Sequence, residues 1–178
     1  QPIMHNQKGR DTVCHQMRLF HTWQYLMETN TQHRYAIVTD VRDVVFQENP
    51  SDWLADYLYE CEHFSNLDID IIAPSEAIAY GDEPWNMDNI LRGYGPYIAQ
   101  RMNSAIVYNV GTIAGTANSI RELCLLLYTM GEGRYIPNDQ SSFGLVVEHE
   151  LFPNIETVNM NSGWACQCAT MFEPSNSH

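Results

Sequence analysis

Basic residues are scarce in this sequence. Nine Lys and Arg stand against 22 Asp and Glu among 178 residues, which gives a formal net charge of -13 at pH 7. The nine are scattered along the chain. Nucleic-acid phosphates are bound by clustered Lys and Arg, and anionic lipids attract basic segments. We therefore expect neither nucleic acid nor a membrane surface as a partner, and an anionic ligand would need a metal ion to bring it in.

Long apolar runs are also missing. No stretch reaches the roughly 18 to 20 apolar residues that span a bilayer, and no signal-peptide pattern opens the chain. The chain begins with Gln1 rather than Met and ends on the polar stretch PSNSH. We expect a fragment of a longer protein, so these absences leave the compartment unknown.

Paired cysteine motifs are absent as well. Cys166-x-Cys168 is too tight for a CxxC zinc site, no second pair lies nearby, and the histidines share no spacing that indicates zinc. Cys124 falls on the apolar stripe of an expected helix and is interpreted as a core residue. We expect free thiols and a reducing environment, with a secretory lumen as the open alternative.

The composition itself is that of a globular domain, with 44% hydrophobic and 17% charged residues. Helical and extended patterns alternate, which predicts one α/β domain with a mainly parallel sheet flanked by helices. The expected helices cover residues 11–30, 85–102 (broken at 93–96) and 139–149, with two more beginning at Pro50 and after Thr116. The expected strands cover residues 35–39, 68–74, 105–115 (interrupted at Asn109 and Gly111) and 155–158.

The first expected helix has one apolar face, formed by Val13, Met17, Phe20, Trp23 and Met27 at spacings of three and four.

The ends of other elements carry signals of their own. Ser51, Thr116 and Asn138 are predicted N-caps of their helices. Pro74 is expected to end its strand, because proline lacks the amide hydrogen that a sheet needs.

The stretch YAIVTDVRDVVFQENP (35–50) raises the question of a site. Asp40 follows a short apolar strand, and Asp43 comes within one turn of it. Ligands of open α/β sheets collect at the carboxyl ends of strands. Two carboxylates there offer oxygen ligands for Mg²⁺ or Mn²⁺, which also bind substrate phosphates. The alternative is a turn cap at Asp40, with Asp43 paired to Arg42.

Four segments together resemble glycosyltransferases of the GT-A fold, in the order of that family. TDVRDVVFQENP (39–50) resembles the metal-binding aspartate-any-aspartate (DxD) motif, and IIAPSEAIAYGDEPWN (71–86) resembles the strand and loop on the acceptor side. YNVGTIAGT (108–116) resembles the Asn-x-Gly strand beside the donor sugar, and PNDQSSF (137–143) resembles the Asp-Gln helix start at the reaction centre. The likeness spans about residues 18 to 164.

The resemblance implies a partial glycosyltransferase catalytic domain over residues 1–178, with a Rossmann-like GT-A fold. Its implied activity is hexosyl-type transfer from a nucleotide-sugar, with a UDP-sugar favoured, to a glycan or other hydroxyl acceptor, using Mn²⁺ or Mg²⁺. The chain departs from the family at Arg42, which widens the DxD spacing. No nucleotide-binding strand precedes Asp11 and no late metal-binding histidine is found, so we expect the first strand and the C-terminal end to be missing.

The site residues follow from the same resemblance. It implies Asp40 and Asp43 as metal ligands, Asp139 and Glu76 as catalytic residues, and Asp82 and Trp85 on the acceptor side. It implies a donor site made of Arg18, Thr39, Asp40, Val41, Arg42, Asn109, Gly111 and Gln140.

Several of these residues also have a purely structural interpretation. Asn109 and Gly111 weaken a strand and could mark a simple bulge. Arg18 could be a solvated helix residue, Trp85 could be core, and Asp139 sits where a helix dipole stabilises any carboxylate.

Two other functions stay open. A degenerate transferase could serve as a non-catalytic carbohydrate-binding scaffold. A haloacid-dehalogenase-like phosphatase would need a second aspartate two residues after Asp40, where Arg42 stands. The compartment is either the cytoplasm or, for a secretory-pathway transferase, the Golgi lumen.

Overall fold

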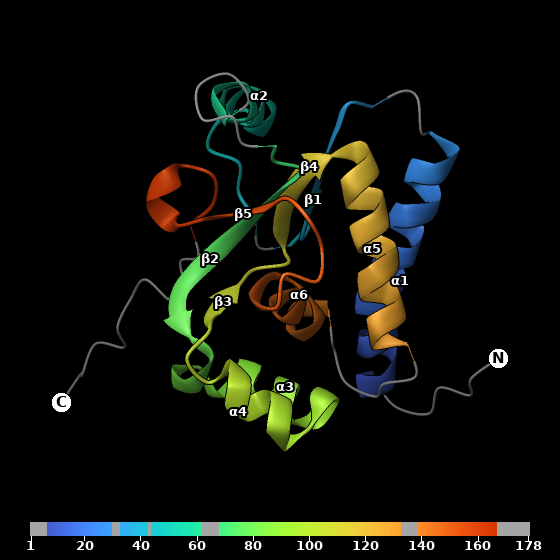
Figure 1. The fold of residues 1–178 in the computed structure, drawn as a ribbon. Helices are drawn as coiled ribbons and strands as arrows, with labels where there is room; N and C mark the ends of the chain where they lie inside the picture. Colours follow the sequence, from blue (N-terminus) through green and yellow to red (C-terminus); the bar gives the residue numbers. More distant parts are fainter. Residues whose placement is uncertain (1–6, 30–32, 43, 62–67, 133–138, 167–178) are drawn as a thin grey trace.

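The computed structural model describes residues 7–29, 33–42, 44–61, 68–132 and 139–166, with only the backbone described for 7–13. In this part of the chain, helices flank a mixed, open five-stranded sheet (Figure 1). The strands are β1 (Tyr35–Thr39), β2 (Ile71–Ala79), β3 (Ile106–Tyr108), β4 (Thr112–Thr116) and β5 (Ile155–Val158). The predicted α/β class is therefore confirmed.

The predicted mainly parallel sheet is wrong. The β1–β4, β4–β2 and β2–β3 pairs are antiparallel, and among the described strands only β2–β5 is parallel. The reason lies between β2 and β3, where two helices gather at one end of the sheet (Figure 1). The chain re-enters the sheet from that end and returns along β2, whereas a parallel neighbour needs a crossover to the opposite end.

The helices lie where their patterns predicted them. They are α1 (Gln7–Glu28), α2 (Pro50–Glu60), α3 (Pro84–Tyr94), α4 (Pro96–Met102), α5 (Ala117–Gly131) and α6 (Asp139–Glu148), with short 3₁₀ turns η2 (Tyr80–Asp82) and η3 (Met160–Ser162). The predicted break falls at Gly95, whose φ of 86° suits glycine in the left-handed region.

The strand ends are partly as predicted. β1 and β5 match their predicted ranges, and the 105–115 strand is interrupted at residues 109–111, as predicted, which divides it into β3 and β4. Pro74 does not end β2, which continues to Ala79. The Pro74 carbonyl still accepts a bond from Asn109 N (2.8 Å), so the pairing survives the missing amide hydrogen.

The helix caps also differ in one place. Thr116 caps α5 as predicted, accepting a bond from Ser119 N. Asn49, not Ser51, caps α2, because the Asn49 side chain accepts from Ser51 N. The predicted cap Asn138 lies outside the described residues.

The inward face of α1 is rotated from the predicted one. Leu19 and Leu26 are buried, whereas Met27 is 49% exposed. Trp23 still packs against the core cluster that contains both leucines. Leu19 and Leu26 are seven residues apart, a spacing that also places both on one helix face. The predicted face was instead drawn through the larger side chains of Met17, Phe20, Trp23 and Met27.

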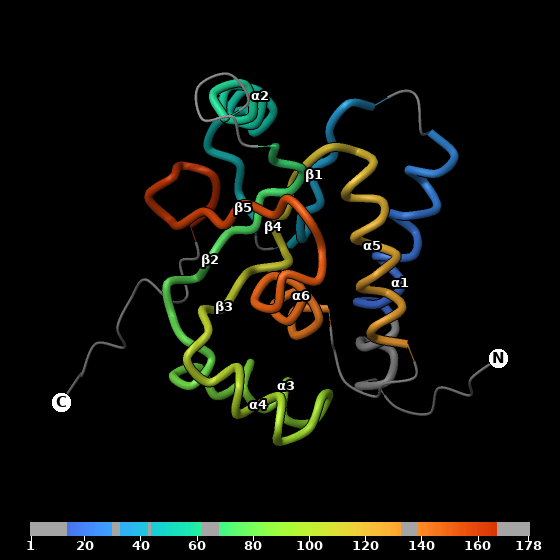
Figure 2. Tube along the Cα trace, in the orientation of Figure 1, coloured from blue at the N-terminus to red at the C-terminus, as the bar shows by residue number. Residues whose placement is uncertain are grey.

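Alternation along β2 gives the sheet two buried faces. Ile71 and Ala73 pack with residues of α1, α5 and α6, and Ile72 packs with Leu54 and Leu58 of α2. Figure 2 shows α1 and α5 side by side, with α2 on the other side of the strands. Within the described residues, no helix has the length and apolar character needed to cross a bilayer.

Cys124 occupies the interior as predicted, and burial raises the pKa of its thiol to about 12. The thiolate is the form that reacts with alkylating agents. We expect iodoacetamide at neutral pH to modify the exposed Cys14 and to spare Cys124 in the folded chain. Peptide mass spectrometry after quenching measures this, with chain unfolded in guanidinium as the control. Equal modification of both thiols in the folded chain would contradict this packing.

Candidate functional site

Arg18 lies at the centre of the candidate site and joins three elements. Its Nη1 donates to Asp40 Oδ1, at the end of β1, and its Nη2 donates to Asp139 Oδ2 (2.9 Å), at the start of α6. Only 6% of the Asp139 side chain is exposed, against 42% of Asp40. The guanidinium thus compensates one buried carboxylate and one that faces outward.

Asp139 is held in its ionised form. Burial alone would raise its pKa, but the neighbouring His15, the Arg18 charge and the backbone amide of Gln140 lower it below the ordinary value. His15 Nδ1 lies 3.6 Å from Asp139 Oδ2. This contact raises the pKa of His15, against the opposing effects of partial burial and of Arg18.

The interruption between β3 and β4 is built around Asn109. Its Oδ1 accepts from Gly111 N (2.7 Å), and its Nδ2 donates to Glu76 Oε1 (2.9 Å). A Cβ on Gly111 would lie 2.5 Å from Asp40 Oδ2. The glycine therefore admits the Asp40 carboxylate, where the sequence suggested room for a ligand.

Gln140 also stabilises the interruption between β3 and β4. Its Nε2 donates to Tyr108 O (2.7 Å), and its Oε1 accepts from Val110 N (3.0 Å). Both ends of the side-chain amide are used on the backbone, so Gln140 holds the interruption in shape in place of a neighbouring strand.

Two cavities meet at Asp40, Asn109 and Gly111, the three residues that line both. The smaller, here the acidic cavity, has a volume of about 380 Å³. It is lined by His15, Arg18, Asp40, Glu76, Glu83, Trp85, Asn86, Asn109, Val110, Gly111, Asp139 and Gln140.

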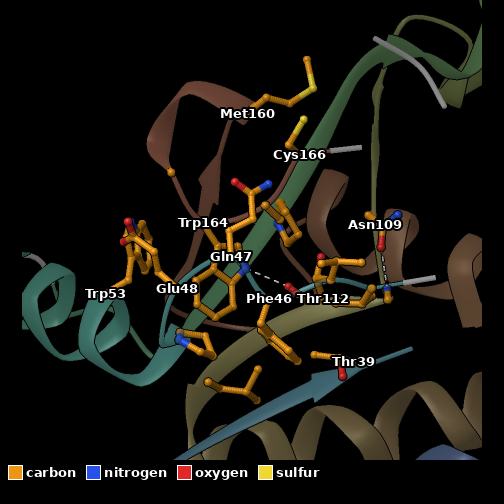
Figure 3. Close-up of a pocket in the computed structure, with 18 of the residues that line it drawn as sticks. Thr39, Phe46, Gln47, Glu48, Trp53, Asn109, Thr112, Met160, Trp164 and Cys166 are labelled. Atoms are coloured by element: carbon orange, nitrogen blue, oxygen red, sulfur yellow. Dashed lines mark hydrogen bonds between the residues drawn. The ribbon is translucent and has the colours of Figure 1, made fainter. Parts of the chain in front are cut away.

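The larger, here the aromatic cavity, has a volume of about 740 Å³ (Figure 3). Its walls come from β1 and the segment after it, from α2, β2 and β4, and from η3 and the residues that follow. The walls include Thr39, Phe46, Gln47, Trp53, Ser75, Thr112 and Trp164.

Most predicted site residues gather at these cavities. Arg18, Asp40, Glu76, Trp85, Asn109, Gly111, Asp139 and Gln140 line the acidic cavity, and Thr39 lines the aromatic one. Val41, Arg42 and Asp82 are exposed and line neither. Asp43 lies outside the described residues.

Sequence reasoning missed His15, Glu83 and the aromatic walls. His15 stands three residues before Arg18, a spacing that puts both on one helix face. Glu83, rather than Asp82, faces the cavity while its carboxylate caps α3 by accepting from Trp85 N and Asn86 N. No local signal links Trp164 to the segment after β1, because only the tertiary fold joins them.

The positions of the carboxylates show whether the described residues could hold a metal ion. The described residues contain no group of three His, Cys, Asp or Glu side chains positioned to hold a cation. Asp40 remains as one partly exposed carboxylate where the cavities meet. Mg²⁺ in phosphate-handling sites is bound by one or two carboxylates and completed by water and phosphate oxygens, and Asp40 fits that pattern.

Comparison of the chain with protein-family models, curated proteins and solved structures gives no match.

Replacing Arg18 by Met should destabilise the fold by about 1 to 3 kcal/mol, because the buried Asp139 carboxylate loses its guanidinium partner. Arg92 and Asp88 form an exposed pair on α3, so Arg92→Met should stay within about 0.5 kcal/mol of the parent. Urea unfolding of the three proteins measures the difference. Equal costs for the two variants would show that the Arg18 bridge is not structural.

The contact between His15 and Asp139 should depend on pH in two steps. The raised pKa of His15 means that its contribution is complete below the ordinary value of 6.5 and is lost as pH rises through the folded-state pKa. The lowered pKa of Asp139 means that its contribution is present above the ordinary 3.8 and is lost as pH falls through the folded-state pKa.

The stability difference between the parent and His15→Gln should therefore be largest between about pH 4 and 6.5. Urea unfolding across a pH series measures it, with His21→Gln, an exposed position of the same helix, as the control. A difference that does not change with pH would refute the pairing.

Proposed function

We propose that this chain is the catalytic part of a glycosyltransferase that moves a sugar from a nucleotide-sugar, with a UDP-sugar favoured, to a hydroxyl acceptor. The observation that carries the proposal is the convergence of Arg18, Asp40, Asn109, Asp139 and Gln140 where two cavities meet. These residues come from four segments, and three of the four resemble GT-A motifs. We further propose that the α/β arrangement belongs to a Rossmann-like GT-A domain.

The two candidate catalytic carboxylates take different roles in this proposal. A general base works best with a pKa near the operating pH. The lowered pKa of Asp139 makes it a weak base but a permanent negative charge, suited to stabilising positive charge on the transferred sugar. Glu76 is 6% exposed, and its position is fixed by a hydrogen bond from Asn109 Nδ2. We assign Glu76 the role of the general base that takes the proton from the acceptor hydroxyl.

The remaining polar residues position the reacting groups. Arg18 contributes a guanidinium that contacts Asp40, and its second hydrogen bond positions Asp139 beside the acidic cavity. Gln140 and Asn109 fix the interrupted strand, and Asn109 thereby holds Glu76 at the junction. These bonds are made within the protein, so the proposed catalytic groups are oriented by the fold itself.

A divalent cation would be held by Asp40, with Asp43 as the second ligand suggested by the sequence. Bound there, Mn²⁺ or Mg²⁺ would act as a Lewis acid toward the departing nucleoside diphosphate.

A non-catalytic carbohydrate-binding scaffold is the second candidate function. The observation that favours it is the occupation of Asp40 by Arg18, which already neutralises the carboxylate that a metal would need. A scaffold would bind saccharide without metal and would not bind UDP. No contact in the described site favours the phosphatase alternative, since Arg42 is exposed and lines neither cavity.

Calorimetric titration of UDP in Mn²⁺, and again in EDTA, tests the proposal. We expect binding that EDTA abolishes and that Asp40→Asn weakens by at least about tenfold, which corresponds to about 1.4 kcal/mol. Asp88→Asn, which changes an exposed aspartate of α3, should bind like the parent. Titration of GDP tests whether binding depends on the uracil base. UDP binding that survives both EDTA and Asp40→Asn would overturn the metal assignment, and absence of UDP binding would favour the scaffold.

A further inference from the structure

We propose that the aromatic cavity is the acceptor subsite and that it takes an uncharged saccharide. This inference rests on the proposed function. It moves the acceptor away from the predicted residues Asp82 and Trp85, because Asp82 lines neither cavity and Trp85 lines the acidic one.

The aromatic walls are held by hydrogen bonds to the protein backbone. Trp53 Nε1 donates to Ser162 O (3.1 Å), and Trp164 Nε1 donates to Thr112 O (2.8 Å). The two indole rings lie 5.0 Å apart between centroids, tilted by 43°. Their polar atoms are thus satisfied by the protein. Trp53 is also stacked on Tyr57, at 4.7 Å between centroids, so the carbon surface left to a ligand is the part of the two indoles that lines the cavity.

Phe46 adds a third aromatic ring that is 56% exposed and lines the same cavity. Figure 3 shows it together with Trp53 and Trp164 in the group of residues around the cavity. Thr39, Gln47 and Ser75 supply hydroxyl and amide groups among the same walls. Aromatic surface with a few polar groups suits a pyranose ring, which has apolar faces and a rim of hydroxyls.

Charge decides against a nucleotide in this cavity. Among the described residues that line it, none is Lys, Arg or His, and Asp40 and Glu48 are acidic. A diphosphate placed there would meet two carboxylates and no basic side chain among these lining residues. The cations near Asp40, namely Arg18 and His15, line the acidic cavity instead. The acidic cavity also carries the carboxylates of Glu76, Glu83 and Asp139. The guanidinium donor of Arg18, rather than net charge, therefore assigns the diphosphate to this side of Asp40 and leaves the aromatic side for an uncharged partner.

Position and size agree with an acceptor role. The cavity of about 740 Å³ lies within the range of small-ligand sites, roughly 300 to 1,000 Å³. It reaches Asp40, Asn109 and Gly111, so a hydroxyl at its inner end would meet the acidic cavity where the transferred sugar would lie. Glu76, the proposed base, is one hydrogen bond from Asn109 at that junction.

A glycan array of neutral, sialylated, sulfated and uronate-containing saccharides tests the subsite directly. The chain should bind neutral members and no acidic ones. The strongest neutral saccharide is then titrated against the parent, Phe46→Ala and Tyr97→Ala. Loss of one stacking ring should weaken saccharide binding about three- to tenfold in Phe46→Ala. Tyr97, 68% exposed and lining neither cavity, is the matched control and should change nothing.

UDP titration in Mn²⁺ with the same variants separates this inference from the proposed function. UDP affinity unchanged by Phe46→Ala supports the acceptor assignment. A preference for acidic glycans, an array without bound neutral glycans, or weaker UDP but unchanged saccharide binding in Phe46→Ala would overturn it. Saccharide binding that depends on Phe46, in a chain without UDP binding, would uphold the saccharide site and overturn the transferase. Near-ultraviolet circular dichroism confirms that each variant is folded.

Discussion

The guanidinium of Arg18 is the constraint on which the rest of the site depends. Its two carboxylate partners are 22 and 121 residues away along the chain, on β1 and α6. A buried carboxylate such as Asp139 is strongly destabilising without a partner. The cost of burying Asp139 therefore fixes the start of α6 against α1. Because the same guanidinium also holds Asp40, the end of β1 is positioned by a residue of α1.

The antiparallel pairing of β3 and β4 with β2 forms the second part of the site, which is the interruption beside Asp40. β3 and β4 pair with β2 in sequence, and the interruption between them falls beside Asp40. Gln140, the residue after Asp139, satisfies the backbone on both sides of Asn109, at Tyr108 O and Val110 N. One helix start thus carries the carboxylate that needs Arg18 and the amide that shapes the interrupted strand. A shift of α6 would disturb both cavities together, which explains why the polar contacts are concentrated there.

Local chemistry made much of this fold predictable. Thr116 was recognisable as a cap, Gly95 as a break, and β1 and β5 as strands, because each depends on a few neighbouring residues. Strand direction was not predictable in that way, since nothing in the sequence of α3 and α4 states that they return the chain to the same end of the sheet. Asp40 was singled out by its position after an apolar strand, and Arg18 and Asp139 by family resemblance, but the mutual contact of the three was not predicted. His15 and Trp164 were missed because their importance arises only from contacts across the fold.

The distribution of charge gives this acidic chain a way to separate two kinds of ligand. With so few basic residues, the position of Arg18 matters more than the net charge. It lines one cavity only, while Asp40 lines both. In the proposed transferase, an anion near Asp40 therefore finds a guanidinium donor on one side only, and an uncharged ring occupies the aromatic cavity on the other. Coulomb interactions are strongest where water is excluded. In the proposed transferase, the same few side chains would hold a charged donor and an uncharged acceptor in two cavities that share the Asp40 carboxylate, with Arg18 and His15 lining the donor side only.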